Sequence, residues 1–355
     1  SDSSGHPFRL WCTGEVSTTI TVSSGGTCVA YYGTGLVHDV AVADITPSKT
    51  VISQGRNLDI NVTVVNPGDY AETFNVTLCA NRGLVGYWMF DEGSGTTAYD
   101  SSGNANNGII HGATWVSGKY GTSLDFDGID DYVDCGNGAS LNVTGNLTVA
   151  AWVNFDGIPS DGVSFVSKDE GPGDTHKWEF GYVQNYVGIS NALVLHVYDP
   201  THGVWIWPHS SMFTPMIGQW YHVAVVKNND NYTFYVNGVN SGEDNATGDL
   251  PSVNAPVEIG RAEGGAYFNG SIDEVKIYGR ASSAGEIWAE YTHADAAIQE
   301  REVSLGIGSS TVVTFTWDTS GFALGDYVVS AYAWPVPGET DLADNICVDG
   351  TVTIR

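Results

Sequence analysis

The sequence is short of charged residues, and of basic residues above all. Only 15% of its 355 residues are charged, against about 25% in typical globular proteins. Thirteen basic residues stand against 41 acidic ones, so the formal net charge is −28. Nucleic-acid binding needs a basic surface that neutralises phosphates. The shortage of Lys and Arg therefore excludes a nucleic-acid partner, whereas an acidic surface suits divalent cations, high salt or simple solubility.

Long hydrophobic runs are missing too. No apolar stretch approaches the roughly 18 residues that a membrane-spanning helix requires, so we expect no membrane span. No basic-plus-apolar signal segment precedes the first strands, and we expect a chain that has already been processed. Several N-x-[ST] sequons favour a glycosylated extracellular or cell-surface protein. The sequon asparagines are Asn61, Asn75, Asn142, Asn146, Asn231, Asn245 and Asn269.

Catalytic sequence patterns are also lacking. The chain contains no G-x-S-x-G, H-E-x-x-H or P-loop motif, and its nine histidines are scattered. Hydrolysis of a glycosidic bond needs two carboxylates across a cleft, and no predicted strand carries several acidic residues at alternate positions. The segment KWEFGYV offers the single Glu179. We therefore expect a protein without enzymatic activity.

The five cysteines form no CxxC pair and have no histidines at zinc-like spacing, so we expect no metal cluster. Cys12 and Cys28 flank an apparent hairpin, EVSTTITVSSGGTCVAYY, and are the first disulfide candidate. Cys79 with Cys347 is the second candidate. Cys135 is then left over as a buried thiol.

What the sequence does contain is a repeated β-strand pattern. Residues 38–82 alternate apolar and polar side chains, as in NLDINVTVV, but supply too few strands to close a core. The same alternation returns over residues 298–355, and the two halves together have about the 100 residues of an immunoglobulin-like sandwich. A guest domain is tolerated at an exposed loop if its own ends lie close together. We predict a discontinuous sandwich interrupted by residues 83–297 and preceded by a hairpin or extension at 1–37.

The guest segment is predicted to be a second β-domain. Its short strands are separated by Gly, Asn and Asp turns, which is typical of a sandwich or jelly roll. One helix is expected at about 284–296, because Ser283 and Glu286 have capping-box spacing and good helix formers follow.

Both parts resemble known families. The segments HDVAVADITPSKTVISQGRNLDINVTVVNPGDYAETFNVTLCAN and VSLGIGSSTVVTFTWDTSGFALGDYVVSAYAWPVPGETDLADN are similar to CARDB, the cell-adhesion-related immunoglobulin-like module of prokaryotic surface proteins. The guest resembles the LamG-like, concanavalin-A-like jelly roll through GYWMFDEGSG, DSSGNANNG, LDFDGIDDYVDCG, WYHVAVVKNNDNYTFYVNG and GSIDEVKIYGRASSAGEI, in family order. These resemblances imply an all-β fold, in which an immunoglobulin-like β-sandwich carries an inserted concanavalin-A-like jelly roll. The latter family includes glycan-binding, adhesive and purely structural units, so the fold alone does not settle function.

One polar loop, YDSSGNANNG at residues 99–108, is a candidate calcium site. Calcium takes six to eight oxygen ligands, and Asp100, Asn104 and Asn107 offer side-chain oxygens. The LamG resemblance implies one calcium between this loop and Asp273 of the IDEV strand, with Asp91 as a further ligand. The ion would fasten two loops together. The alternative is a metal-free loop whose side chains cap their own backbone.

A second acidic segment, DFDGIDDYVD, lacks the spacing and the distal Glu of an EF-hand. Two strands joined by a Gly/Asp turn explain it better.

Aromatic residues supply a candidate sugar site. In HGVWIWPH, Trp205 and Trp207 project to the same face at period 2, and Trp178 and His202 are further candidates. A flat aromatic pair suits stacking on a pyranose ring. The alternative is that these tryptophans belong to the core.

Two functions from different classes remain. The first is a non-catalytic structural or adhesive surface protein, such as a filament or sheath subunit, whose partners are other copies of itself or other surface proteins. Its STTITV segment would then pair with an exposed sheet edge of a neighbour, or fold back on its own domain. The second is a secreted carbohydrate-binding protein that targets polysaccharide or glycoprotein glycans.

Overall fold

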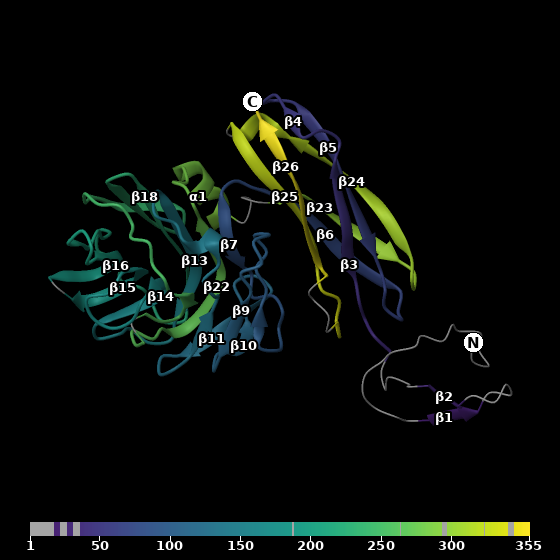
Figure 1. The fold of residues 1–355 in the computed structure, drawn as a ribbon, viewed down its shortest axis with the longest axis horizontal. Coiled ribbons are helices and arrows are strands. Elements are labelled where there is room, and N and C mark those ends of the chain that lie inside the picture. The colour runs from purple at the N-terminus through teal and green to yellow at the C-terminus, as the bar shows by residue number, and fades with distance from the viewer. Residues whose placement is uncertain are drawn as a thin grey trace.

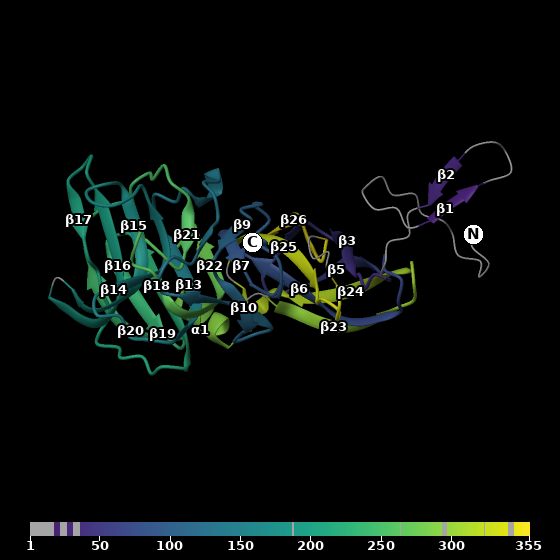
Figure 2. The same cartoon turned by 90° about the horizontal axis from the view of Figure 1, so that it is seen from below.

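The protein is nearly all-β and is built from two β-domains that lie side by side (Figures 1 and 2). The computed structural model describes residues 18–21, 27–30, 36–186, 188–262, 264–292, 297–322, 324–339 and 344–355. Within this part of the chain there is one α-helix, and it is too short to cross a membrane. The all-β fold class predicted from the sequence is confirmed.

The guest domain is a jelly roll of two stacked sheets, which we call the back sheet and the front sheet. Each contains eight strands. The back sheet runs in the order β10 (Thr114–Ser117), β11 (Thr122–Asp127), β22 (Asn269–Tyr278), β13 (Leu147–Phe155), β18 (Trp220–Asn228), β19 (Asn231–Val236) and β20 (Val239–Asn245), and β7 (Leu84–Trp88) also pairs with β22. The front sheet runs in the order β17 (Val204–Ile206), β16 (Ile189–Asp199), β15 (Lys177–Tyr186), β14 (Gly162–Asp169), β21 (Val257–Ile259), β12 (Tyr132–Asp134), β9 (Gly108–His111) and β8 (Thr97–Ala98).

The jelly-roll core lies between these sheets because alternate residues of each strand point inward. In β15, Trp178, Phe180 and Tyr182 are buried in this core, while Glu179 between them points to the other side of the front sheet. A short 3-10 turn, η1 (Ala139–Leu141), follows β12. Because the residues between these core positions point the other way, polar and aromatic side chains lie on the outer face of the front sheet.

Helix α1 (Ala284–Tyr291) covers part of the outer face of the back sheet, where Ile287 packs against Ala150 and Tyr235. The predicted capping box is present: the Ser283 side chain accepts from the Glu286 N–H, and the Glu286 side chain accepts from the Ser283 N–H. The helix ends at Tyr291, which is earlier than the predicted residue 296. Residues 293–296 lie outside the described part of the chain.

The host domain is a β-sandwich formed by segments on both sides of the guest domain. One sheet has the order β23 (Ala297–Leu305), β6 (Glu72–Asn81), β25 (Gly325–Ala333), β26 (Ile346–Ile354) and β4 (Val51–Ile52). The other has the order β24 (Ser310–Asp318), β5 (Asn57–Val65) and β3 (Ala41–Pro47), and a 3-10 turn, η2 (Thr319–Gly321), follows β24. Because β6 pairs with both β23 and β25, the sheet joins residues that the guest domain separates in the sequence.

The core of the host sandwich follows the alternation seen in its strands. Leu58, Ile60, Val62 and Val64 of β5 are buried, whereas the residues between them face solvent or are only partly covered. They pack in one cluster with residues of both sheets, including Trp317 of β24. The period-2 pattern therefore located the buried face correctly.

The predicted disulfide between Cys79 and Cys347 is wrong. The two residues lie on β6 and β26, and β25 runs between these strands. Strands two places apart are separated by about 9.6 Å, which exceeds the Cα separation that a disulfide spans. Cys135 is a buried thiol, as expected, and burial raises its pKa well above its ordinary value.

The N-terminal hairpin is present as β1 (Thr18–Thr21) and β2 (Thr27–Ala30), which pair antiparallel. Among the described strands they pair only with each other and join neither domain. The predicted Cys12–Cys28 disulfide falls outside the described side chains.

Candidate functional site

The polar loop at residues 99–108 is organised around Asp100, whose carboxylate is buried and fully hydrogen-bonded. Its Oδ1 accepts from the N–H groups of Tyr87 and Ser102, at 3.0 and 2.9 Å. Its Oδ2 accepts from the Ser102 hydroxyl at 2.8 Å and from the Asn106 N–H at 2.9 Å. A carboxylate offers about four lone-pair positions, and protein donors use four of them here.

The neighbouring asparagines serve the same loop. Asn107 Oδ1 accepts from the Asp100 N–H at 2.9 Å, and Asn104 Nδ2 donates to the Ser102 hydroxyl at 3.0 Å. Asn106 ties the loop to β7 and η1, because its Nδ2 donates to Val85 O and to Ser140 Oγ. In this structure Asp100, Asn104 and Asn107 are hydrogen-bonded within the loop and to β7, and their role as calcium ligands stays a prediction.

The other two predicted ligands, Asp91 and Asp273, contact the same turn. Both carboxylates bind the backbone of the turn at residues 118–122: Asp91 Oδ1 accepts from the Thr122 N–H and Asp273 Oδ2 from the Tyr120 N–H, each at 3.0 Å. Glycines allow this close approach, because a Cβ at Gly121 would lie 1.9 Å from Asp91 Oδ1 and one at Gly118 would lie 2.7 Å from Asp273 Oδ2. We call Asp91, Asp273 and the 118–122 turn the carboxylate clamp.

The electrostatics of the clamp are unfavourable without a counter-ion. Burial, followed by repulsion from Glu274, raises the pKa of Asp91 from 3.8 to about 8. The same two causes, with Asp91 itself, raise the pKa of Asp273 well above its ordinary value. Asp273 Oδ1 is buried and has no hydrogen-bond partner among the described residues. A buried carboxylate with an unused oxygen and an acidic neighbour is a donor set that fits calcium.

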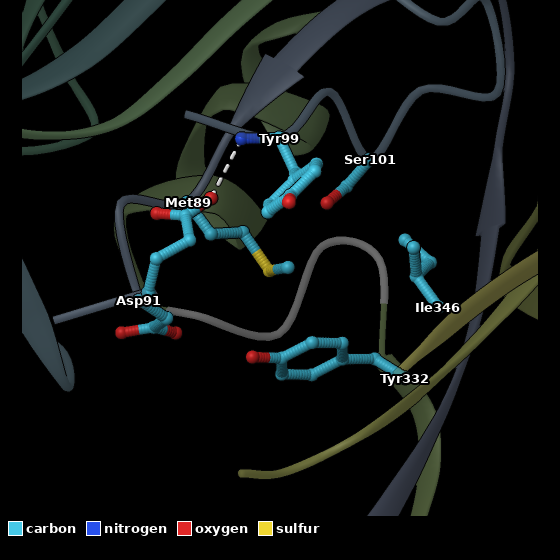
Figure 3. A pocket seen from close by; sticks show the side chains of 7 residues that line it. Met89, Asp91, Tyr99, Ser101, Tyr332 and Ile346 are labelled. Carbon is cyan, nitrogen blue, oxygen red and sulfur yellow. Dashed lines mark hydrogen bonds between the residues drawn. The ribbon is translucent and has the colours of Figure 1, made fainter. Parts of the chain in front are cut away.

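A small cavity adjoins the clamp where the two domains meet (Figure 3). Met89, Asp91, Tyr99 and Ser101 line it from the guest side, while Tyr332 and Ile346 line it from the host side, and Glu92 completes it. Its volume of about 20 Å³ is enough for a water molecule or an ion. It cannot accommodate a sugar.

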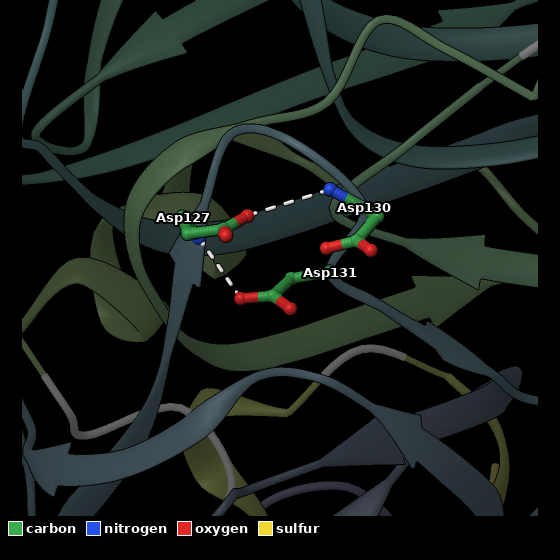
Figure 4. Close-up of side chains that lie close together, drawn as sticks. All are labelled: Asp127, Asp130 and Asp131. Carbon is green, nitrogen blue, oxygen red and sulfur yellow. Dashed lines mark hydrogen bonds between the residues drawn. The ribbon is translucent and has the colours of Figure 1, made fainter.

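The acidic segment 125–134 contains a tight turn. The carboxylates of Asp127 and Asp131 accept hydrogen bonds from backbone N–H groups of this turn (Figure 4). Asp127 Oδ1 accepts from the N–H of Ile129 at 2.8 Å, and Asp131 Oδ2 accepts from the N–H of Asp127 at 3.0 Å. The flanking strands β11 and β12 belong to different sheets. The interpretation of this segment as a hairpin is therefore wrong, although its Gly/Asp turn is present.

An aromatic cluster lies on the outer face of the front sheet. It consists of Trp205 and Trp207 around β17 together with His196 and Tyr198 of β16, and we call it the aromatic platform. The His196 ring stacks on Trp207 at 3.6 Å and 9°. Trp205 makes edge contacts with Tyr198 at 4.5 Å and with His196 at 5.1 Å. These contacts hold Trp205 while leaving it 48% exposed.

The two tryptophans do not form the coplanar pair expected from the sequence. Their ring centroids are 5.9 Å apart, but the planes are inclined by 53°. One face of Trp207 stacks on His196, and Trp205 is the more exposed of the two rings. Trp178 is buried in the core at 1% exposure, and its prediction as a sugar-binding residue is wrong.

Polar groups lie at the end of β16, one residue beyond Tyr198. Asp199 Oδ1 accepts from the N–H groups of Thr201 and His202, and its Oδ2 contacts His202 Nδ1 at 2.5 Å. Burial raises the pKa of Asp199, but the hydrogen bonds from His202 and Thr201 outweigh it, so the pKa lies below its ordinary value. The predicted His202 side chain is 74% exposed.

Glu179, which was not predicted as part of this site, holds the His196 ring of the platform in place. Glu179 of β15 accepts a hydrogen bond from Nδ1 of His196, its cross-strand partner on β16. The available signal was the alternation in KWEFGYV, which places Glu179 on the face opposite Trp178 and Phe180.

The sequons are accessible. The side chains of Asn61, Asn142, Asn231, Asn245 and Asn269 are exposed, and those of Asn75 and Asn146 are partly exposed.

Residues 127–288 match the family model of the concanavalin A-like lectin/glucanases superfamily. The guest domain is concanavalin A-like. The match covers less than half of the chain and contains neither Asp91 nor the host sandwich. No curated protein sequence matches the chain.

Solved structures with similarity to the chain include domain 4 of AbnA, a GH43 extracellular arabinanase from Geobacillus stearothermophilus, in complex with arabinotriose. It has a TM-score of 0.48 at 21% identity and covers 59% of this chain and 98% of that chain. The binding domain of Paraclostridial mosquitocidal protein 1 has a TM-score of 0.48 at 18% identity, over 59% and 52% of the two chains. Trypanosoma rangeli sialidase has a TM-score of 0.43 at 18% identity, over 59% and 33%.

Proposed function

We propose that the protein is a non-catalytic, extracellular glycan-binding protein and that the aromatic platform is its binding site. The observation that carries this proposal is the environment of Trp205. A large apolar ring that is half-exposed and held by Tyr198 and His196 is pre-organised for a flat apolar ligand face. The less polar face of a pyranose or furanose ring has this character.

The groups around Trp205 supply the polar half of such a site. Sugar-binding sites combine an apolar surface with a few placed hydrogen-bonding groups. Asp199 is ionised at neutral pH, and its Oδ2 contacts Nδ1 of the exposed His202 ring at 2.5 Å. His202 would hydrogen-bond a sugar hydroxyl, while Trp205 stacks on the ring.

The charge of the protein limits the class of glycan. With a net charge of −28, uronates, sulfated glycans and sialic acids are repelled over the surface. Asp199 and Glu179 place two further carboxylates next to the platform. The expected ligand is therefore a neutral oligosaccharide or polysaccharide.

Calcium has a structural part in this proposal. Asp91 and Asp273 would hold the ion against the 118–122 turn, with backbone oxygens and water completing the shell. The ion would neutralise two buried carboxylates and fasten the loop after β7 to β22 and to that turn. It would stabilise the jelly roll and would have no contact with the sugar.

The host sandwich is proposed to be a CARDB-like spacer that carries the concanavalin A-like domain. Its described residues pack into a core of their own, which suits a rigid support. Exposed sequons over both domains favour a secreted or surface-attached protein.

The proposal is tested by incubating the intact, glycan-trimmed protein with an array of neutral and acidic glycans. We expect retention on one class of neutral glycan, and titration calorimetry with the best ligand should give an affinity in the micromolar range, about −8 kcal/mol. Binding only to acidic glycans, or binding to none, would refute the assignment.

A further inference from the structure

Strand β24 is an open edge of the host sandwich. Among the described strands it pairs with β5 alone, through nine consecutive residue pairs without a bulge. Proteins commonly protect such edges with Lys, Pro, bulges or covering loops. From Ser310 to Trp317 the strand has no charged residue and no proline, and it is rich in the β-branched residues Val and Thr.

The register shows which backbone groups are open. Asn66 donates its N–H to Ser309 O, so the odd-numbered residues of this strand direct their polar groups toward β5. The N–H groups of the even-numbered residues therefore point outward. Thr316 confirms this direction, because its N–H reaches Gln299 Oε1 on β23 at 3.5 Å. Among the described residues, Val312 and Thr314 have no backbone partner on the outer side.

The N-terminal hairpin lacks a third strand among the described strands. Its two strands of four residues, TTIT and TCVA, pair with each other and with no other described strand. A two-stranded hairpin is marginally stable in water, and a third strand is needed for independent stability. In both views of the fold the hairpin lies away from the two domains (Figures 1 and 2).

We propose that the hairpin of one copy adds as a strand to the β24 edge of a second copy. A four-residue strand fits within the five-residue open stretch Ser310–Thr314, and both segments are uncharged and rich in Thr and Val or Ile. Main-chain hydrogen bonds supply the affinity of such strand addition. The contact is heterologous, because each copy offers one hairpin and one edge, so it propagates into rings or filaments.

The test is sedimentation velocity of the full chain over a concentration series, with hydrogen exchange of the Ser310–Thr314 amides. Wild type should self-associate, and the Val312 and Thr314 amides should gain protection as concentration rises. Val312→Pro removes an outward N–H without touching the β5 ladder, and association should weaken by about tenfold or more. Val312→Thr keeps the N–H and the branched side chain and should associate like wild type.

Val312→Lys decides the question if the proline variant fails to fold, since an edge lysine blocks strand addition. Wild type that stays monomeric at every concentration would overturn the proposal. So would equal association of the wild-type, proline and lysine proteins. Protection of Val312 and Thr314 that does not depend on concentration would show instead that the hairpin folds back on its own copy.

Discussion

Replacing Trp205 by alanine is expected to abolish glycan binding while leaving the fold intact. The half-exposed indole is the most exposed ring of the aromatic platform, and aromatic anchors of this kind contribute at least about 2 kcal/mol to binding. The affinity should fall by about 30-fold or more. Titration calorimetry with the best array ligand measures the loss.

The matched control is Trp288→Ala. Trp288 is 51% exposed, but it lies on α1, which covers the back sheet on the opposite side of the jelly roll. Its removal should leave the affinity unchanged. Circular dichroism and the melting temperature of both variants establish that each is folded. Equal affinity of the Trp205→Ala protein and wild type would place the sugar elsewhere.

Removing calcium with a chelator should lower the melting temperature by about 5–10 °C at pH 8, since an ion at roughly 100-fold over its dissociation constant stabilises by about 2.7 kcal/mol. The effect should be smaller at pH 5. Burial raises the folded-state pKa of Asp91 to about 8 from 3.8, so the metal-free protein is most stable where this carboxyl is protonated in both states. It loses stability as pH rises from about 4 through about 8. Calcium removes this loss by holding the ionised pair.

Two substitutions separate the carboxylate clamp from the polar loop. Asp273→Asn should make the melting temperature insensitive to chelator, because one of the two proposed ligands is lost. Asp100→Asn should lower the melting temperature and leave the chelator effect in place, because the Asp100 carboxylate accepts from backbone N–H groups and is outside the carboxylate clamp. Differential scanning calorimetry with and without EDTA measures both. An unchanged wild-type transition at pH 8, or chelator sensitivity lost in Asp100→Asn alone, would contradict the assignment.

Local signals predicted the parts of the fold that depend on neighbouring residues. The capping box at Ser283 and Glu286 starts α1 as expected, because both partners lie within one turn. The alternation in β5 located a buried face, because a strand has a period of two. Applied to KWEFGYV, the same rule would have placed Trp178 in the core with Phe180 and Tyr182.

Long-range relations were harder to predict, because they depend on which strands become neighbours. Cys79 and Cys347 both lie in the same sheet, yet β25 comes between them. Asp91 and Asp100 are nine residues apart, but one binds the 118–122 turn and the other binds β7 and its own loop. No rule based on sequence spacing predicts that these two side chains bind different parts of the backbone. The inclination of Trp205 against Trp207 depends likewise on His196, which comes from another strand.

Stacking of a neutral sugar on Trp205 can be seen in a crystal structure of the intact chain with the best array ligand. We expect a sugar ring lying face-on against the Trp205 indole, with a hydroxyl within hydrogen-bonding distance of His202. A sugar bound at any other surface, with the aromatic platform empty, would contradict it.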